Sequence, residues 1–177
     1  MELENSIMMT PTEIEFLYQV VSLLPKDSIV LEVGTALGGS SEVMARANPA
    51  VKIFTIDLFG ENGTDSISVE TLYNTVKTRL SKFSNITVLC GNAMTDFNNW
   101  STKIDLYFED GVHIDPGLMT NLNKWTSFLK PGGILLVHDY NEYCPDVEKN
   151  IQQLIKLNKF EIVKQVESLI MLKNREK

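Results

Sequence analysis

The chain contains only two histidines, and each of them stands close to an aspartate in the sequence. His113 comes three residues after Asp110, and His138 directly precedes Asp139. Each pair lies at the end of a short apolar run that is typical of a buried strand. Since the carboxyl ends of parallel strands meet at one edge of a sheet, we expect these four side chains to converge. Such a cluster of titratable groups indicates a functional site.

Two kinds of chemistry suit this cluster. In the first, Asp110, His138 and Asp139 bind a divalent cation that orients a hydroxyl group of the substrate and lowers its pKa. Oxygen ligands alone would favour Mg²⁺, whereas a ligating His138 favours Mn²⁺, Fe²⁺ or another softer ion. In the second, His113 or His138 acts as a general base without a metal, because an unperturbed imidazole pKa of about 6.5 suits that role. The candidate catalytic residues are therefore Asp110, His113 and His138.

A glycine-rich segment, EVGTALGGSS at 32–41, follows the first apolar run and precedes a helical pattern. Glycines let the chain turn sharply and let a ligand approach the backbone. The spacing matches neither the G-x-G-x-x-G fingerprint of dinucleotide-binding folds nor a P-loop, which disfavours a nicotinamide-dependent dehydrogenase. The segment indicates either a nucleotide-type ligand at the carboxyl edge of the sheet or a turn that only packs a helix against a strand.

Asp57 favours the ligand. It lies at the end of the second apolar run, 23 residues after Gly34. This is near the spacing at which an acidic residue accepts hydrogen bonds from ribose hydroxyls in nucleotide-binding folds. A carboxylate can accept two hydrogen bonds from a vicinal diol, so we predict that Asp57 binds a ribose.

Together these segments resemble the class I, Rossmann-like S-adenosylmethionine (SAM)-dependent methyltransferases. EVGTALGGSS is similar to their first motif and FTIDLF to their second, while IDLYFEDGVH and LKPGGILLVHDY are similar to the later ones. The DGxH and HDY segments resemble most the branch that methylates hydroxyl groups of small molecules. The resemblance covers about residues 28–140.

The resemblance implies a SAM site in which the glycine-rich turn approaches the methionine moiety, Asp57 binds the ribose, and Leu58 or Phe59 lies against the adenine. Glu32 would stabilise the turn or the ammonium group, and the GNAM turn at 91–94 would meet the adenine amine. The full set of implied cofactor residues is Glu32, Gly34, Thr35, Gly38, Ser40, Asp57, Leu58, Asn92, Ala93 and Asp110. The chain departs from many relatives in having Asn92 in place of an aspartate and His138 in place of a carboxylate.

Strand-like and helix-like patterns alternate along the chain. Thr10, Pro11 and Glu13 form a capping box with proline at the first helical position, which predicts a helix over about 11–24. Further helices are expected at 39–47, at 68–82, at 115–129 with an Asp115-Pro116 cap, and after a cap at Asp146. Strands are expected at 28–33, 51–58, 85–90, 104–109 and 133–138, and the runs 160–166 and 168–173 should form an antiparallel hairpin.

This alternation predicts one α/β domain over 1–177, a three-layer sandwich around a doubly wound, mostly parallel sheet. The resemblance implies seven strands in the order 3-2-1-4-5-7-6, with the C-terminal antiparallel hairpin at one edge. Little of the chain remains to cover the site apart from the N-terminal helix and the segments 59–68 and 139–145. A second subunit is therefore expected to cover the cleft, as a homodimer, unless the substrate is polar and tolerates an open site.

Composition excludes several classes of protein. Sixteen basic and twenty-three acidic residues give a net charge of −7, which disfavours binding to nucleic acid or to an anionic membrane. No apolar run exceeds four residues, and the N-terminus lacks the pattern of a secretory signal, so a cytoplasmic protein is expected. Cys90 and Cys144 are then expected to be reduced thiols.

The leading hypothesis is a SAM-dependent methyltransferase that transfers a methyl group to a hydroxyl of a small molecule such as a sugar, a polyol or a natural-product intermediate. The alternative is a SAM-binding regulatory or vestigial protein without transfer activity. A vestigial protein has no need of Asp110, His113, His138 and Asp139 at one sheet edge, which favours the enzyme.

Overall fold

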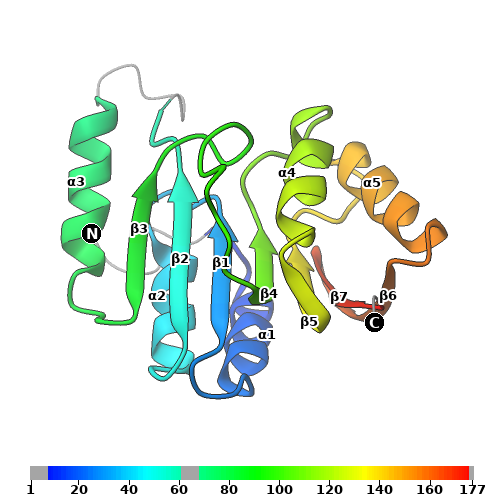
Figure 1. Cartoon of the computed structure of the whole chain (residues 1–177), viewed down its shortest axis with the longest axis horizontal. Coiled ribbons are helices and arrows are strands. Elements are labelled where there is room, and N and C mark those ends of the chain that lie inside the picture. The colour runs from blue at the N-terminus through cyan, green and yellow to red at the C-terminus, as the bar shows by residue number, and fades with distance from the viewer. Residues whose placement is uncertain (1–7, 61–67, 176–177) are drawn as a thin grey trace.

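The computed structural model describes residues 8–60 and 68–175. Within these ranges seven strands form one sheet in the order β3-β2-β1-β4-β5-β7-β6 (Figure 1). All pairs from β3 to β5 are parallel, and β7 is antiparallel to both β5 and β6. The strands are β1 (Ile29–Val33), β2 (Lys52–Asp57), β3 (Ile86–Cys90), β4 (Ile104–Glu109), β5 (Leu129–Val137), β6 (Phe160–Val166) and β7 (Leu169–Asn174). The predicted fold class and strand order are confirmed.

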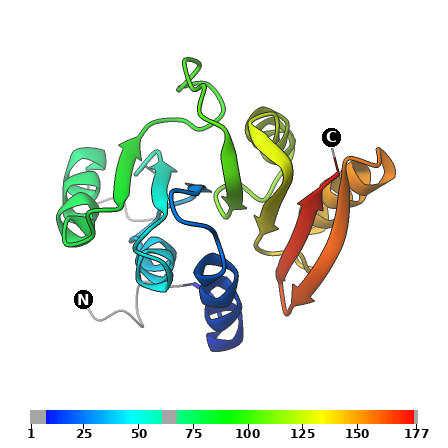
Figure 2. The ribbon, with the colours of Figure 1, turned by 60° about the horizontal axis from the view of Figure 1, so that its bottom comes forward.

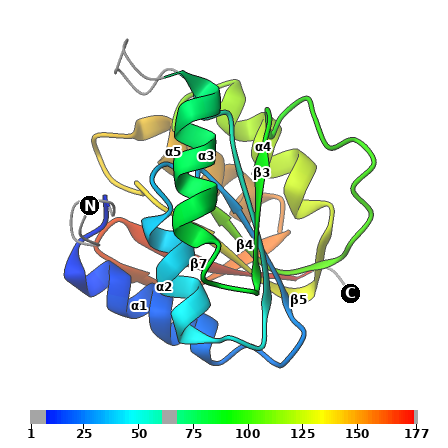
Figure 3. The same ribbon diagram turned by 90° about the vertical axis from the view of Figure 1, so that its left-hand side faces the viewer.

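Helices cover both faces of this sheet, which makes the predicted three-layer sandwich. Figure 2 shows α1 and α2 on one face and α4 and α5 on the other, while α3 lies beside the β3 edge; the sheet is seen nearly edge-on in Figure 3. The helices are α1 (Pro11–Ser22), α2 (Gly39–Ala47), α3 (Val69–Leu80), α4 (Gly117–Thr126) and α5 (Pro145–Lys156).

The two faces of the sheet carry separate hydrophobic clusters. On the α4 and α5 face, Leu31, Tyr107 and Trp125 belong to one buried cluster. On the α1 and α2 face, Val30 and Leu106 belong to the other. Adjacent residues of one strand therefore point into different clusters, which explains why the central strands read as continuous apolar runs in the sequence.

The start of α1 confirms the predicted capping box. The Thr10 side chain accepts a hydrogen bond from the Glu13 N–H, and the Glu13 carboxylate accepts one from the Thr10 N–H at 2.9 Å. The helix ends at Ser22, two residues before the predicted end. The capping box thus fixes the position of the Glu13 side chain relative to the start of α1.

Two other predicted caps differ in the structure. Helix α4 begins after Pro116, and the carboxylate of Asp115 instead accepts hydrogen bonds from Lys149 and Asn150, both at 2.7 Å. Helix α5 begins at Pro145, and the carboxylate of Asp146 accepts the Asp115 N–H at 3.0 Å. The two aspartates therefore join the beginnings of α4 and α5, and Asp115 also accepts the Met119 N–H in the first turn of α4.

Residues 91–103 connect β3 to β4 without a helix. The Trp100 ring from this connection packs edge-on against Phe54 and Trp125, with ring centroids 5.1 and 5.5 Å apart. These aromatic contacts cover part of the sheet that a helix would otherwise cover.

No helix in the described ranges is both long and apolar enough to cross a membrane. Of the segment 59–68, which was expected to help cover the site, residues 61–67 lie outside the described residues.

Candidate active site

The loops after β1 and β4 meet at the carboxyl edge of the sheet. The Asp110 N–H donates to the Val33 carbonyl at 2.9 Å, and the Gly34 N–H donates to the Ile56 carbonyl at 2.9 Å, so strand pairing continues into these loops. Gly34 has φ +100°, and a Cβ atom there would lie 2.2 Å from the Asp110 carbonyl oxygen. Because β1 lies between β2 and β4, this is the place where the strand order reverses and where α/β folds bind ligands.

Glu32, near the end of β1, holds the glycine-rich turn through hydrogen bonds to side chains around it. Its buried carboxylate accepts hydrogen bonds from the hydroxyls of Ser40 at 2.5 Å, Thr55 at 2.6 Å and Ser41. The Thr55 hydroxyl also lies 2.6 Å from that of Thr35. Burial raises the pKa of Glu32 to about 7, although the three hydroxyls favour its charged form. Of the two roles that the resemblance implies for Glu32, these contacts support the stabilisation of the turn.

Asp57 joins the glycine-rich turn to the end of β2. One carboxylate oxygen accepts the Ala36 N–H at 2.8 Å, and the other accepts the Phe59 N–H at 2.7 Å. Each oxygen keeps a second lone pair for a further donor. Leu58 is 51% exposed beside the cavity, whereas Phe59 is buried against Tyr73, so Leu58 is the residue available to a ligand.

The turn at 91–94 is closed by its own hydrogen bonds. The Asn92 side-chain oxygen accepts the Met94 N–H at 2.9 Å, and the Asn92 N–H donates to Asp96 at 2.8 Å. Asn92 therefore shapes the turn, and its side-chain oxygen has one lone pair left for an adenine amine.

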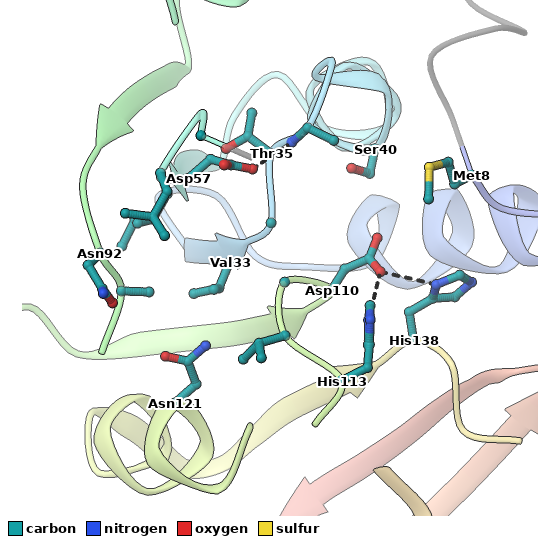
Figure 4. Close-up of a pocket in the computed structure, with 18 of the residues that line it drawn as sticks. Met8, Val33, Thr35, Ser40, Asp57, Asn92, Asp110, His113, Asn121 and His138 are labelled. Carbon is teal, nitrogen blue, oxygen red and sulfur yellow. Dashed lines mark hydrogen bonds and ion pairs between the residues drawn. The ribbon is translucent and has the colours of Figure 1, made fainter. Parts of the chain in front are cut away.

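These loops enclose a cavity of about 840 Å³, which is within the range of small-molecule and cofactor sites (Figure 4). Its lining includes these residues predicted from the sequence: Gly34, Thr35, Ser40, Asp57, Leu58, Asn92, Ala93, Asp110, His113, His138 and Asp139. Glu32 and Gly38 are not among the lining residues. A Cβ atom at Gly38 would lie 3.0 Å from the Leu80 side chain, so this glycine allows α2 to approach α3.

Several lining residues were not predicted individually, although Met94 belongs to the predicted turn at 91–94. Met8, Met94, Val112 and Asn121 reach the cavity from the segment before α1, the β3–β4 connection, the β4–α4 loop and α4. Their types carry no chemical signal in a sequence, and only the tertiary fold brings them together. Met8, Met94 and Val112 add apolar surface to the cavity wall, and Asn121 adds an amide.

Both imidazoles and both aspartates converge as predicted. His113 Nε2 lies 3.3 Å from Asp139 Oδ2 and 3.7 Å from Asp110 Oδ1. His138 Nδ1 lies 3.1 Å from Asp110 Oδ1 and 3.6 Å from Asp139 Oδ2. In Figure 4 the two rings approach Asp110 from different directions.

The shared charges change the acidity of this cluster. Burial alone would lower the pKa of His138, but the Asp110 hydrogen bond and the charges of Asp110, Asp139 and Glu13 raise it to about 9. The Asp110 carboxylate, 3.7 Å from His113 Nε2, is also the main cause that raises the pKa of His113, against its burial. The unperturbed imidazole pKa on which the metal-free base was predicted therefore does not hold here. Burial would raise the pKa of Asp110, but the two neighbouring imidazoles keep it below the ordinary value.

The donor atoms of this cluster fit a divalent cation. One atom from each of Asp110, His113 and Asp139 lies within 4.8 Å of the others, and His138 Nδ1 is directed at the same two carboxylates. The prediction had named His138 and not His113 as the nitrogen ligand, whereas the geometry makes both available. Mixed nitrogen and oxygen donors suit Mn²⁺, Fe²⁺ or Zn²⁺ better than Mg²⁺.

Glu13 is the functional candidate that sequence reasoning missed. Its carboxylate oxygen Oε2 lies 3.4 Å from His138 Nε2, and the residue is 1% exposed. The sequence identified Glu13 only as part of a helix cap. No pattern links it to a histidine 125 residues away, so only the fold shows this contact.

Solved structures share this fold at low sequence identity. A putative caffeoyl-CoA O-methyltransferase from Staphylococcus aureus is 16% identical, with a TM-score of 0.76 over 98% of this chain and 88% of that one. The O-methyltransferase NovP is 16% identical, with a TM-score of 0.73 over 97% and 83%. The N-methyltransferase NodS from Bradyrhizobium japonicum WM9, in complex with S-adenosyl-L-homocysteine (SAH), is 19% identical, with a TM-score of 0.67 over 98% and 97%.

The sequence itself matches a family. No curated protein matches the chain, but a family model described as a methyltransferase domain matches residues 31–140, which is more than half of it. This range contains the glycine-rich turn, Asp57 and the paired histidines and aspartates. The chain therefore belongs to this methyltransferase domain family, as its resemblance to the class I, SAM-dependent methyltransferases predicts.

Proposed function

We propose that this protein transfers a methyl group from SAM to a hydroxyl group of a small molecule, with a divalent cation bound beside the acceptor. One observation carries the proposal. The cavity joins the turn and the ribose-type carboxylate of a nucleoside site at one end to a cluster of two aspartates and two imidazoles at the other. The N-methyltransferase among the structural neighbours shows that this fold alone does not choose oxygen as the acceptor atom.

The cofactor end would hold SAM through the glycine-rich turn, Asp57 and Leu58. Gly34 leaves the backbone accessible because it carries no side chain, and Asp57 presents lone pairs at the edge of the cavity. When bound, SAM supplies a methyl group activated by its sulfonium charge. The carboxylates of Asp57 and Asp110 also give the cavity a negative character that suits a cationic ligand.

The acceptor end would hold the cation through Asp110, Asp139 and the imidazole nitrogens. A bound divalent cation lowers the pKa of a hydroxyl group, which makes it a nucleophile at neutral pH. The residues around the cation would also position that hydroxyl beside the methyl group. Such positioning alone lowers the activation free energy by several kcal/mol. Met8 lies on the same side of the site as Asp110 and His138 in Figure 4, so an acceptor with an apolar face would be in contact with it.

The paired histidines also separate the proposal from a SAM-binding protein that does not transfer methyl groups. A regulatory module needs the cofactor end alone. Here Asp110, His113, His138 and Asp139 lie together in the wall of the same cavity, beside the place where a methyl acceptor would enter.

Calorimetric titration with SAH, SAM and NAD tests the cofactor, and NAD should not bind. Transfer of tritium from methyl-labelled SAM to a panel of catechols, sugars and polyols, with a panel of amines as the comparison, tests the acceptor. Labelling of hydroxyl compounds that is lost on chelation and restored by Mn²⁺ is expected. Labelling of amines alone would show that the acceptor assignment is wrong, and SAH binding without any labelling would favour the regulatory alternative.

A further inference from the structure

Glu13 connects three parts of the chain that are distant in sequence. It belongs to the first turn of α1, and its Oε1 accepts hydrogen bonds from the N–H and the hydroxyl of Ser168, at 2.9 and 2.6 Å. Ser168 lies in the turn between β6 and β7, and its carbonyl accepts the Tyr140 N–H just after β5. The other oxygen, Oε2, faces His138 at the end of β5.

These contacts use the two oxygens of Glu13 for different tasks. Oε1 serves Ser168, while Oε2 serves the helix cap at Thr10 and the imidazole of His138. A glutamate that only completes a capping box can remain in water, whereas Glu13 is 1% exposed. A carboxylate buried to this extent requires compensating partners, and the His138 imidazole is one of them beside Ser168 and Thr10.

The contact determines which nitrogen of His138 faces the cavity. Nε2 is turned to Glu13, and Nδ1 is turned to Asp110 and Asp139. His138 is 5% exposed, so its ring is held by these neighbours and not by solvent. A carboxylate that accepts the proton of one ring nitrogen leaves the lone pair of the other nitrogen available as a ligand. This arrangement is common behind metal-binding histidines.

We propose that Glu13 is a positioning residue for the cation end of the site: it holds the Nε2–H of His138 and so directs Nδ1 at the space between Asp110 and Asp139. The inference rests on the proposed function, because it assumes a cation at that end. It adds a residue of the N-terminal helix, remote from the motifs of the family, to the apparatus that orients the ligands. It also connects the position of α1 to the geometry of the site.

The variant Glu13→Gln tests this role. Glutamine keeps one oxygen, which can still accept from Ser168, while its amide NH2 takes the place of Oε2 and offers no acceptor to the Nε2–H of His138 or to the Thr10 N–H. Glu15→Gln is the matched control, because it makes the same chemical change two residues further along α1 at an exposed position. Thr10→Ala is the second control: it removes the hydroxyl that caps α1 and donates to Glu13 Oε2 at 3.2 Å, but it keeps the Thr10 N–H and the charged carboxylate that faces His138.

Mn²⁺ binding, followed by electron paramagnetic resonance, is the first measurement. Glu13→Gln should weaken Mn²⁺ binding by about 10- to 100-fold, the usual effect of losing a residue that orients a metal ligand. Both controls should bind Mn²⁺ as the unmodified protein does. Equal Mn²⁺ affinity of Glu13→Gln and the unmodified protein would overturn the inference, and so would equal weakening by Thr10→Ala, which would indicate a purely structural role.

Nitrogen NMR of the unmodified protein gives a second measurement that no folding defect can affect. The chain has two histidines, so ¹⁵N-histidine labelling gives two ring spectra, and a His113→Asn variant assigns them. With Zn²⁺ bound, His138 should carry its proton on Nε2 and the metal on Nδ1. A proton on Nδ1, or no effect of Zn²⁺ on this ring, would refute the inference.

SAH titration of the same samples separates the inference from the proposed function. If SAH binds to all variants equally and only the Mn²⁺ results contradict the expectation, the role of Glu13 is wrong and the cofactor assignment stands. If the unmodified protein binds no SAH, the proposed function fails first, and the inference fails with it.

Discussion

Gly34 and the backbone of Asp110 are packed so closely that no side chain fits between them: a Cβ atom on Gly34 would lie 2.2 Å from the Asp110 carbonyl oxygen. Gly34 also has φ +100°, a conformation that other residues rarely adopt. The contact brings the glycine-rich turn after β1 directly against the loop that carries Asp110 and His113. One small residue therefore fixes the spacing between the two ends of the site.

Gly34→Ala is expected to abolish SAH binding or to prevent folding, because the new methyl group would have to push the β1 and β4 loops apart. Gly132→Ala is the control: this glycine has φ +72° as well, but a Cβ atom there would have its nearest neighbour at an ordinary distance of 3.7 Å, and it does not line the cavity. Calorimetry with SAH and thermal unfolding measure the two effects. Unchanged SAH affinity in a folded Gly34→Ala protein would contradict the packing argument.

Asp57→Ala is expected to weaken SAH binding by about 1–3 kcal/mol, or about 5- to 150-fold. The substitution removes the acceptor for ribose hydroxyls and also frees the N–H groups of Ala36 and Phe59. Asp57→Asn separates these effects, because one side-chain oxygen remains to accept a backbone N–H. If both variants bound SAH as tightly as the unmodified protein, the ribose assignment would be wrong.

The alternation of apolar runs and helical patterns was sufficient to predict the fold. Central parallel strands such as β1 and β4 are buried on both faces, so their sequences are continuous apolar runs that are readily identified as strands. The start of β5 was missed by four residues, because its first part contains Pro131 and two glycines and pairs with β4 across an irregularity. The caps expected at Asp115 and Asp146 differ in the structure because each aspartate takes part in contacts between the beginnings of α4 and α5.

The polar residues of the site were predicted where they follow strand ends, because parallel strands bring their carboxyl ends together. Glu13 could not be found in this way. Its contact with His138 depends on how α1 packs against the end of β5 and the β6–β7 turn, and no local pattern encodes that packing. Gly38 was expected at the cofactor but packs against Leu80 of α3 instead, and the position of α3 is also not encoded by a local pattern.

The pH dependence of stability should reveal the buried carboxyl group of Glu109. Complete burial raises its pKa to about 7 from an ordinary value of 4.5, although hydrogen bonds from Tyr107 and from the Gly111 N–H favour the charged form. Because the pKa is higher in the folded protein, this group contributes stability that is fully present below about pH 4.5 and is lost as the pH rises to about 7.

Glu109→Gln, which is neutral at every pH, removes this dependence. The free energy of unfolding of the unmodified protein, minus that of Glu109→Gln, should fall by roughly 3 kcal/mol between pH 4.5 and pH 8, since one pKa unit corresponds to about 1.4 kcal/mol. Urea unfolding of both proteins across this range measures the difference. Parallel stability curves would show that Glu109 titrates normally.

Asp139→Asn tests the cation site directly. Asp139 has φ +58°, in the left-handed region that asparagine also tolerates, so the loop should keep its conformation. The variant loses one negative charge from the ligand set, and Mn²⁺ binding should weaken by at least about tenfold while SAH affinity stays unchanged. Glu142→Gln, an exposed residue of the same loop, is the control and should bind Mn²⁺ normally. Full methyl transfer by the unmodified protein after exhaustive chelation would refute the proposed cation site. The acceptor hydroxyl would then need a base from the protein, and His113 is the candidate.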